Sequence, residues 1–136
     1  MPVIEWSEQY SIGIPSVDEQ HKTLVGFINR LNEAMAVGEA REVLADILVG
    51  LSQYTKEHFS YEEELFARFG YAESESHINE HHRMIKRVHQ FSLDFQQDAS
   101  GAISLELMQF MTNWLLNHIQ HSDRDYAPFL IAKGVK

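Results

Sequence analysis

Residues 44–70, LADILVGLSQYTKEHFSYEEELFARFG, decide the fold of this chain. Apolar side chains recur in this stretch at steps of three and four residues, which is the period of one face of an α-helix. Gly70 ends the pattern, and glycine is typical of the left-handed position that follows a helix. The same face also carries His58 and Glu62. The stretch therefore predicts a core helix at about 40–69 with polar groups in its last turns.

Three other stretches repeat this period and are separated by short glycine-, serine- or aspartate-containing breaks. We therefore predict long helices at about 18–37, 40–69, 74–98 and 102–121. Since no stretch has the alternating pattern of a β-strand, the prediction is an all-α protein, an antiparallel up-down-up-down four-helix bundle formed by a single domain, residues 1–136.

The two ends of the chain have different patterns. Residues 1–17 contain two prolines and a glycine, which favours an extended arm laid over the core. Pro128 lacks a backbone N–H and is tolerated in the first turn of a helix, so we predict a separate short helix at about 125–132. The chain is then expected to bend around Asp123.

Composition excludes several function classes. The chain has 136 residues, of which 44% are hydrophobic, enough for one core. Its 20 acidic and 11 basic residues give a formal charge of -9, which argues against a nucleic-acid partner. No apolar run reaches the roughly 18 residues of a membrane span, and the first residues lack a secretory pattern, so we expect a cytoplasmic protein without membrane insertion.

Histidine is the unusual residue in this composition. There are no cysteines, so any metal must be held by nitrogen and oxygen ligands. Of the 8 histidines, five fall on the apolar stripes: His21, His58, His77, His81 and His118. One such histidine is usually a hydrogen-bonded core residue. Five of them together with a buried carboxylate require a compensating positive charge, because unpartnered buried polar groups each cost about 1–3 kcal/mol.

Bundle topology brings these residues to one level. In an antiparallel bundle the start of the first helix, the end of the second, the start of the third and the end of the fourth meet at the same end. His58 with Glu62, and His77 with His81, are each four residues apart and so share a face. Of the three glutamates at 62–64, only Glu62 is expected inside; the others are expected on the solvated face.

Asp123 is the ambiguous member of the set. It follows His118 by five residues, which places it about 140° away on a regular helix, so we expect the bend near Pro128 to turn it inward. Capping the final helix is its alternative role.

In its order and spacing, the set His21, His58-Phe59-Ser60-Tyr61-Glu62, His77-x3-His81 and His118-x4-Asp123 resembles the hemerythrins of the bacterial single-domain type. The resemblance covers nearly the whole chain and implies a four-helix bundle with a non-heme diiron centre, bridged by oxo or hydroxo, that binds O2 reversibly. It implies that His77, His81 and His118 bind one iron, that His21 and His58 bind the other, and that Glu62 and Asp123 bridge both. This set, with the bridge, would supply eleven of the twelve bonds of two octahedral irons and leave one position for O2.

The resemblance also implies an apolar pocket around that open position, which would keep water and acid away from bound O2. The pocket residues are Leu24, Phe59, Trp114, Leu115 and Ile119. Each of them is equally explained as ordinary bundle core.

The expected function is therefore O2 storage, transport or delivery to an oxygen-consuming enzyme, by a monomer that is not itself an enzyme. A diiron oxidase or peroxidase is one alternative, although that class uses more carboxylates and a Glu-x-x-His pattern that is missing here. An O2, redox or iron sensor is another. Zinc fits imidazole ligands but usually takes four ligands at a single ion.

Overall fold

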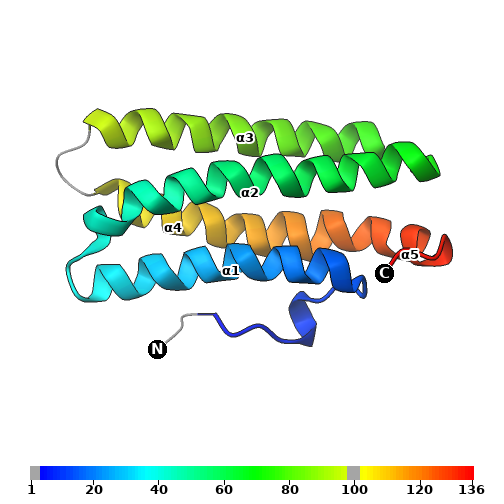
Figure 1. Ribbon diagram of the computed structural model, residues 1–136, viewed down its shortest axis with the longest axis horizontal. Coiled ribbons are helices and arrows are strands. Elements are labelled where there is room, and N and C mark those ends of the chain that lie inside the picture. The colour runs from blue at the N-terminus through cyan, green and yellow to red at the C-terminus, as the bar shows by residue number, and fades with distance from the viewer. Residues whose placement is uncertain (1–3, 98–101) are drawn as a thin grey trace.

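The computed structural model describes residues 4–97 and 102–136, and these residues form helices and no strand. The long helices are α1 (Pro15–Ala36), α2 (Ala40–Phe69), α3 (Ser74–Gln97) and α4 (Ala102–Trp114). A π-helical segment, Leu115–Asp123, continues α4, and α5 (Arg124–Ala132) follows it directly. Consecutive helices run in opposite directions, so the predicted up-down-up-down four-helix bundle is confirmed (Figure 1).

Each long helix packs against at least two others. Helices α1 and α3 both pack against α2 and against α4. Gly70 ends α2 with a positive φ of 73°, and its N–H donates to the Phe66 carbonyl at 2.8 Å, as predicted for a glycine cap. Among the described residues, no helix has both the length and the apolar character needed to cross a membrane.

The N-terminal arm differs from the prediction in two ways. A short 3-10 helix, Glu8–Tyr10, interrupts it, and α1 begins at Pro15 rather than at residue 18. Proline has the backbone angle of a first helical turn and needs no hydrogen bond there, so the helix can begin on it. The Asp18 carboxylate accepts hydrogen bonds from the Ser11 hydroxyl and the Ile12 N–H and so holds the arm to α1. Residues 1–3, and residue 98 of the predicted third helix, lie outside the described part of the chain.

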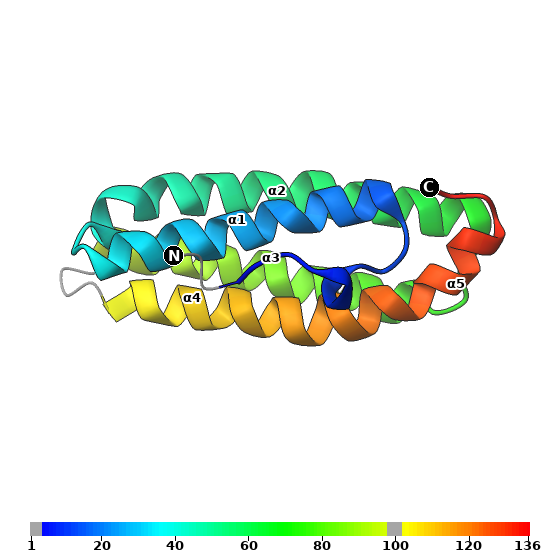
Figure 2. The same cartoon turned by 90° about the horizontal axis from the view of Figure 1, so that it is seen from below.

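The arm lies over α1 and over the helix formed by α4 and its continuation (Figure 2). Asn29 of α1 exchanges two hydrogen bonds with the backbone of Ile4. At the other end, Arg124 donates to the carbonyls of Gln9 and Ser11. The arm is therefore fixed to α1 and to the start of α5.

The predicted short C-terminal helix is present as α5, but the predicted break before it is wrong. The chain stays helical through Asp123, and Pro128 lies within α5, on its exposed side. Asp123 has helical backbone angles, and its side chain makes no capping hydrogen bond, so the capping alternative is wrong as well. The reason is that the change of phase comes from the π-helical segment rather than from proline.

Two apolar clusters lie inside the bundle. The larger one fills the space between the four helices. The smaller one closes the end of the bundle where α5 lies, and its fully buried members are Ile14, Val17, Phe66, Tyr126 and Leu130. A group of buried polar side chains lies between these clusters, since His77 contacts Phe66 and Tyr126 while His81 stacks on Phe59 of the larger cluster.

Candidate metal centre

All seven residues predicted as ligands meet at this level of the bundle, and each is at most 4% exposed. Their donor atoms form two groups in which every atom lies within 4.8 Å of the others. One group is His77, His81, His118 and Asp123. The other is His21, His58, Glu62 and Asp123.

The Nε2 atoms of the histidines face the two carboxylates. In the first group, Asp123 Oδ1 lies 2.8 Å from Nε2 of His77 and 3.0 Å from Nε2 of His118. In the second group, Glu62 Oε1 lies 2.5 Å from Nε2 of His58, and Asp123 Oδ2 lies 2.9 Å from Nε2 of His21. Asp123 thus presents one oxygen to each group. Glu62 also reaches both, because its Oε2 lies 3.2 Å from His77.

The π-helical segment explains how Asp123 joins this set. A regular α-helix would place Asp123 far around the helix from His118. In a π-helix the hydrogen bonds run from residue i to i+5, and the wider turn brings residues five apart onto nearly the same face. Both side chains are therefore buried in one site, although the helix does not break.

Many of these polar atoms lack hydrogen-bond partners. The short contacts between the histidine Nε2 atoms and the Asp123 carboxylate do not have hydrogen-bond geometry. Within each group, these nitrogen and oxygen atoms instead face a shared central point. The buried atoms without a partner include Glu62 Oε1, His81 Nε2, His118 Nε2, His21 Nδ1 and both carboxylate oxygens of Asp123. Leaving a single buried polar group unsatisfied costs about 1–3 kcal/mol. A cation at the centre of each group would satisfy the inward-facing atoms, and imidazole and carboxylate donors suit iron.

The two carboxylates are held in the ionised form. Burial and Asp123 act to raise the pKa of Glu62, but contacts with His58 and His77 lower it to about 2. Burial likewise opposes the ionised form of Asp123, yet contacts with His118, His21 and His77 bring its pKa well below the usual range. At neutral pH both side chains carry negative charge in the interior.

Burial and the neighbouring carboxylates shift the pKa values of the histidines in different directions. Burial acts to lower the pKa of His77, but its contacts with Asp123 and Glu62 raise it to about 10. The pKa of His118 is also raised, chiefly by Asp123 and against burial. In contrast, burial lowers the pKa of His81 to about 3, so its ring is neutral at neutral pH. At neutral pH the proton on His77 therefore offsets part of the negative charge of the carboxylates when no metal does.

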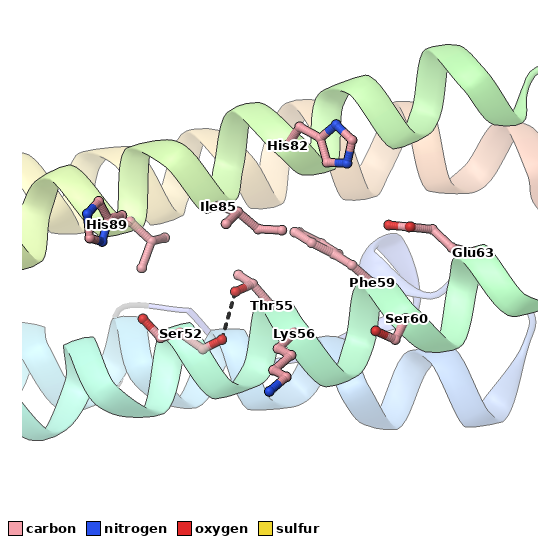
Figure 3. A pocket seen from close by; sticks show the side chains of 10 residues that line it. Ser52, Thr55, Lys56, Phe59, Ser60, Glu63, His82, Ile85 and His89 are labelled. Carbon is pink, nitrogen blue, oxygen red and sulfur yellow. Dashed lines mark hydrogen bonds between the residues drawn. The ribbon is translucent and has the colours of Figure 1, made fainter.

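Outward-facing ring nitrogens contact a second set of polar side chains, which the sequence did not reveal. Nδ1 of His81 donates to Glu63 at 2.9 Å, and Nδ1 of His118 donates to Glu80 at 3.1 Å. Nδ1 of His58 contacts the amide oxygen of Gln20. Glu63, predicted on the solvated face, is only 32% exposed, because its carboxylate turns from α2 into the groove between α2 and α3 (Figure 3).

No signal within a single helix could have revealed these partners. Glu63 lies on α2 and its histidine on α3, while Glu80 lies on α3 and its histidine on the π-helical segment. Which side of one helix meets which side of the next depends on how the helices rotate when they pack. Sequence periodicity gives only the apolar face.

All five residues predicted to surround O2 belong to the larger apolar cluster or pack against it, and two of them, Phe59 and Trp114, stack on histidines of the site. Leu24, Leu115 and Ile119 are fully buried, and Phe59 is 2% exposed. The Phe59 ring stacks on His81 with 3.8 Å between centroids, and the half-buried Trp114 stacks on His118 at 4.0 Å. Phe59 also forms part of the wall of a groove of about 390 Å³ on the surface between α2 and α3 (Figure 3).

Two buried tyrosines border the site as well, and the sequence did not single them out. Tyr54 stacks on His58 at 5.2 Å, and Tyr126 contacts His77 at 5.4 Å. Burial, with the nearby charges of Glu62 and Asp123, raises the pKa of both phenols well above the usual value. They are therefore neutral hydroxyls on either side of the carboxylates.

The remaining three histidines, His82, His89 and His121, are exposed and belong to neither group of donor atoms. The apolar period of the sequence therefore separated the histidines of the site from those of the surface.

Comparisons with known proteins agree with this geometry. Residues 12–130 match the family model described as "Hemerythrin HHE cation binding domain". The chain is 35% identical over 127 residues to a bacteriohemerythrin of Stenotrophomonas maltophilia, covering 93% of this chain and 81% of that protein. It is 31% identical to a bacteriohemerythrin of Clostridium acetobutylicum, with 89% and 96% covered. A wild-type hemerythrin crystal structure superposes with a TM-score of 0.81 at 27% identity, covering 93% of this chain and 96% of that one.

Proposed function

Because the chain belongs to the hemerythrin family, we propose that it binds O2 reversibly at a pair of iron ions held in the buried site. The proposed ligands of one iron are His77, His81 and His118, and those of the other are His21 and His58. Glu62 and Asp123, whose oxygens face both groups, would bridge the two irons.

One observation carries the metal assignment. His81 Nε2 and Glu62 Oε1 face each other at 3.8 Å, are fully buried, and have no hydrogen-bond partner. Nδ1 of the neutral His81 ring donates to Glu63, so the proton is on Nδ1 and Nε2 carries a lone pair. Two buried electron-pair donors that face one another repel unless a cation lies between them.

When bound, two irons would supply the electrons and the one free coordination position that O2 binding requires. The protein then has two tasks, which are to keep the donors in place and to exclude water. Leu24, Leu115 and Ile119 are fully buried in the larger apolar cluster, lie within three residues of His21 or His118 in the sequence, and have side chains without polar atoms. Phe59 and Trp114 cover two of the imidazoles by stacking on them.

A carrier fits this donor set better than an oxidase. The site has five imidazoles and two carboxylates, whereas ferritin-like diiron enzymes use a carboxylate-rich set. We therefore propose O2 storage or delivery to an oxygen-consuming enzyme as the physiological role.

The proposal is tested on anaerobic, iron-loaded protein. Iron quantification should give two irons per chain, and an O2 titration should produce an absorption band that disappears when the sample is purged with inert gas. A stoichiometry near one, or a spectral change that purging does not reverse, would contradict the proposal.

A further inference from the structure

The partners of the outward-facing nitrogens differ between the two groups of donors. In the three-histidine group, two imidazoles donate to carboxylates, namely Glu63 behind His81 and Glu80 behind His118. In the two-histidine group, His58 contacts a neutral amide, and Nδ1 of His21 is buried without a hydrogen-bond partner. Both outer carboxylates therefore belong to the same group.

These carboxylates are held in place and partly shielded from water. The side chains of Glu63 and Glu80 are 32% and 27% exposed. Glu80 also accepts a hydrogen bond from the Ser122 hydroxyl at 2.8 Å, so its oxygen is fixed between Ser122 and His118. A carboxylate behind an imidazole keeps the proton on Nδ1, orients the ring and makes Nε2 a stronger donor.

The negative charges around the site are also distributed unequally between the two groups of donors. Two divalent ions bring four positive charges, and the bridging pair Glu62 and Asp123 supplies two negative ones. Glu63 and Glu80 add two more negative charges, and both lie next to the three-histidine group. The compensation for a buried charge is therefore more complete at that position than at the other.

We propose that Glu63 and Glu80 are positioning residues that make the two metal positions unequal. The three-histidine position fills first and binds its ion more tightly, and the two-histidine position fills second. This inference rests on the proposed metal site, but it does not depend on O2 binding.

The test is a titration of the metal-free, full-length protein with Co²⁺ under argon, followed by absorption against a competing chelator. The expected isotherm has two steps and a total of two Co²⁺ per chain. His81→Ala should remove the tighter step, and His58→Ala should remove the weaker one. If the tighter step disappears with His58→Ala instead, the proposed order is wrong.

Charge-only variants then test the outer carboxylates. Glu63→Gln and Glu80→Gln should each weaken the tighter step by about 10- to 100-fold, the usual effect of losing such a partner, and leave the weaker step unchanged. Matched controls are Glu64→Gln and Glu75→Gln, which remove the same charge from exposed positions on the same helices. Equal losses in the controls, or no loss in the test variants, would overturn the inference.

Urea unfolding of the metal-free variants distinguishes positioning from a structural role. A positioning role leaves the unfolding free energy of Glu63→Gln and Glu80→Gln equal to that of their controls. A general loss of stability in both test variants would assign these side chains to the fold instead. If the parent protein itself fails to take up two Co²⁺, the proposed function fails, and this outcome is distinct from a parent that binds two ions in equal steps.

Discussion

A substitution at Leu115 distinguishes most sharply between two roles for the apolar residues, protection of bound O2 and ordinary core packing. It is fully buried in the larger apolar cluster, together with Leu24, Phe59 and Ile119, and precedes His118 by three residues. Leu115→Ala removes three carbons from this position. At about 0.8 kcal/mol for each buried methylene-sized group, the transfer loss is roughly 2.4 kcal/mol. A residual cavity brings the expected cost to about 2–5 kcal/mol of unfolding free energy.

Leu107 provides the matched control. It is also fully buried in the same cluster, on α4, about two helical turns before Leu115 and farther from the ligands. Leu107→Ala should therefore cost the same 2–5 kcal/mol or so without opening the site to water.

The assay measures two quantities on each variant. Urea unfolding gives stability, and repeated cycles of oxygenation and purging give the rate at which the reversible O2-binding form is lost. Both variants should be destabilised and should still load two irons. Only Leu115→Ala should lose reversible binding markedly faster, and its rate should rise more steeply as the pH falls. Equal loss rates in the two variants would show that Leu115 serves packing alone.

The remaining predictions concern the ligands and pH. Ala substitution of a predicted ligand should abolish O2 binding in an O2 titration, and this applies to His58, His77, His81 and His118. Ala substitution of an exposed histidine should preserve binding, and this applies to His82, His89 and His121. Loss of binding in His82→Ala would contradict the assignment. Chelator-stripped protein should melt well below iron-loaded protein in a thermal scan, and equal melting temperatures would refute a structural role for the metal. Because neutral imidazole is the metal-binding form, iron should be released below about pH 5, as measured by a colorimetric chelator, and retention at pH 4 would argue against five imidazole ligands. In the metal-free protein, the raised pKa of His77, about 10, adds to the free energy of unfolding. This contribution is complete when the pH is below the ordinary pKa of histidine, and it is lost as the pH rises through about 10. The lowered pKa of Glu62, about 2, also adds to the free energy of unfolding. This contribution is present when the pH is above the ordinary pKa of glutamate, and it is lost as the pH falls toward 2. The lowered pKa of His81, about 3, acts in the same pH range, because burying this neutral ring costs stability once the pH falls below the ordinary histidine pKa. Thermal scans of stripped protein should therefore show the highest melting temperature near the ordinary histidine pKa of about 6.5, and a melting temperature that rises steadily to pH 10 would refute this.

The sequence by itself determined the helices, their antiparallel order and the level at which the seven predicted ligands meet. It could do so because the apolar period of three and four residues depends only on local helix geometry. The same period separated His81, which is buried, from its exposed neighbour His82. Helix length then determined the level of each predicted ligand along the bundle axis, since every residue adds about 1.5 Å.

Only the tertiary structure decided how the side chains around that level are oriented. Asp123 enters the site through a π-helical segment, and the wider turns of that segment change the helix phase in a way that an α-helical period cannot anticipate. Glu63 and Glu80 became partners of His81 and His118 across helix boundaries. Such contacts depend on the rotation of each helix about its own axis, and that rotation is fixed by the packing of neighbouring helices rather than by the pattern within one of them.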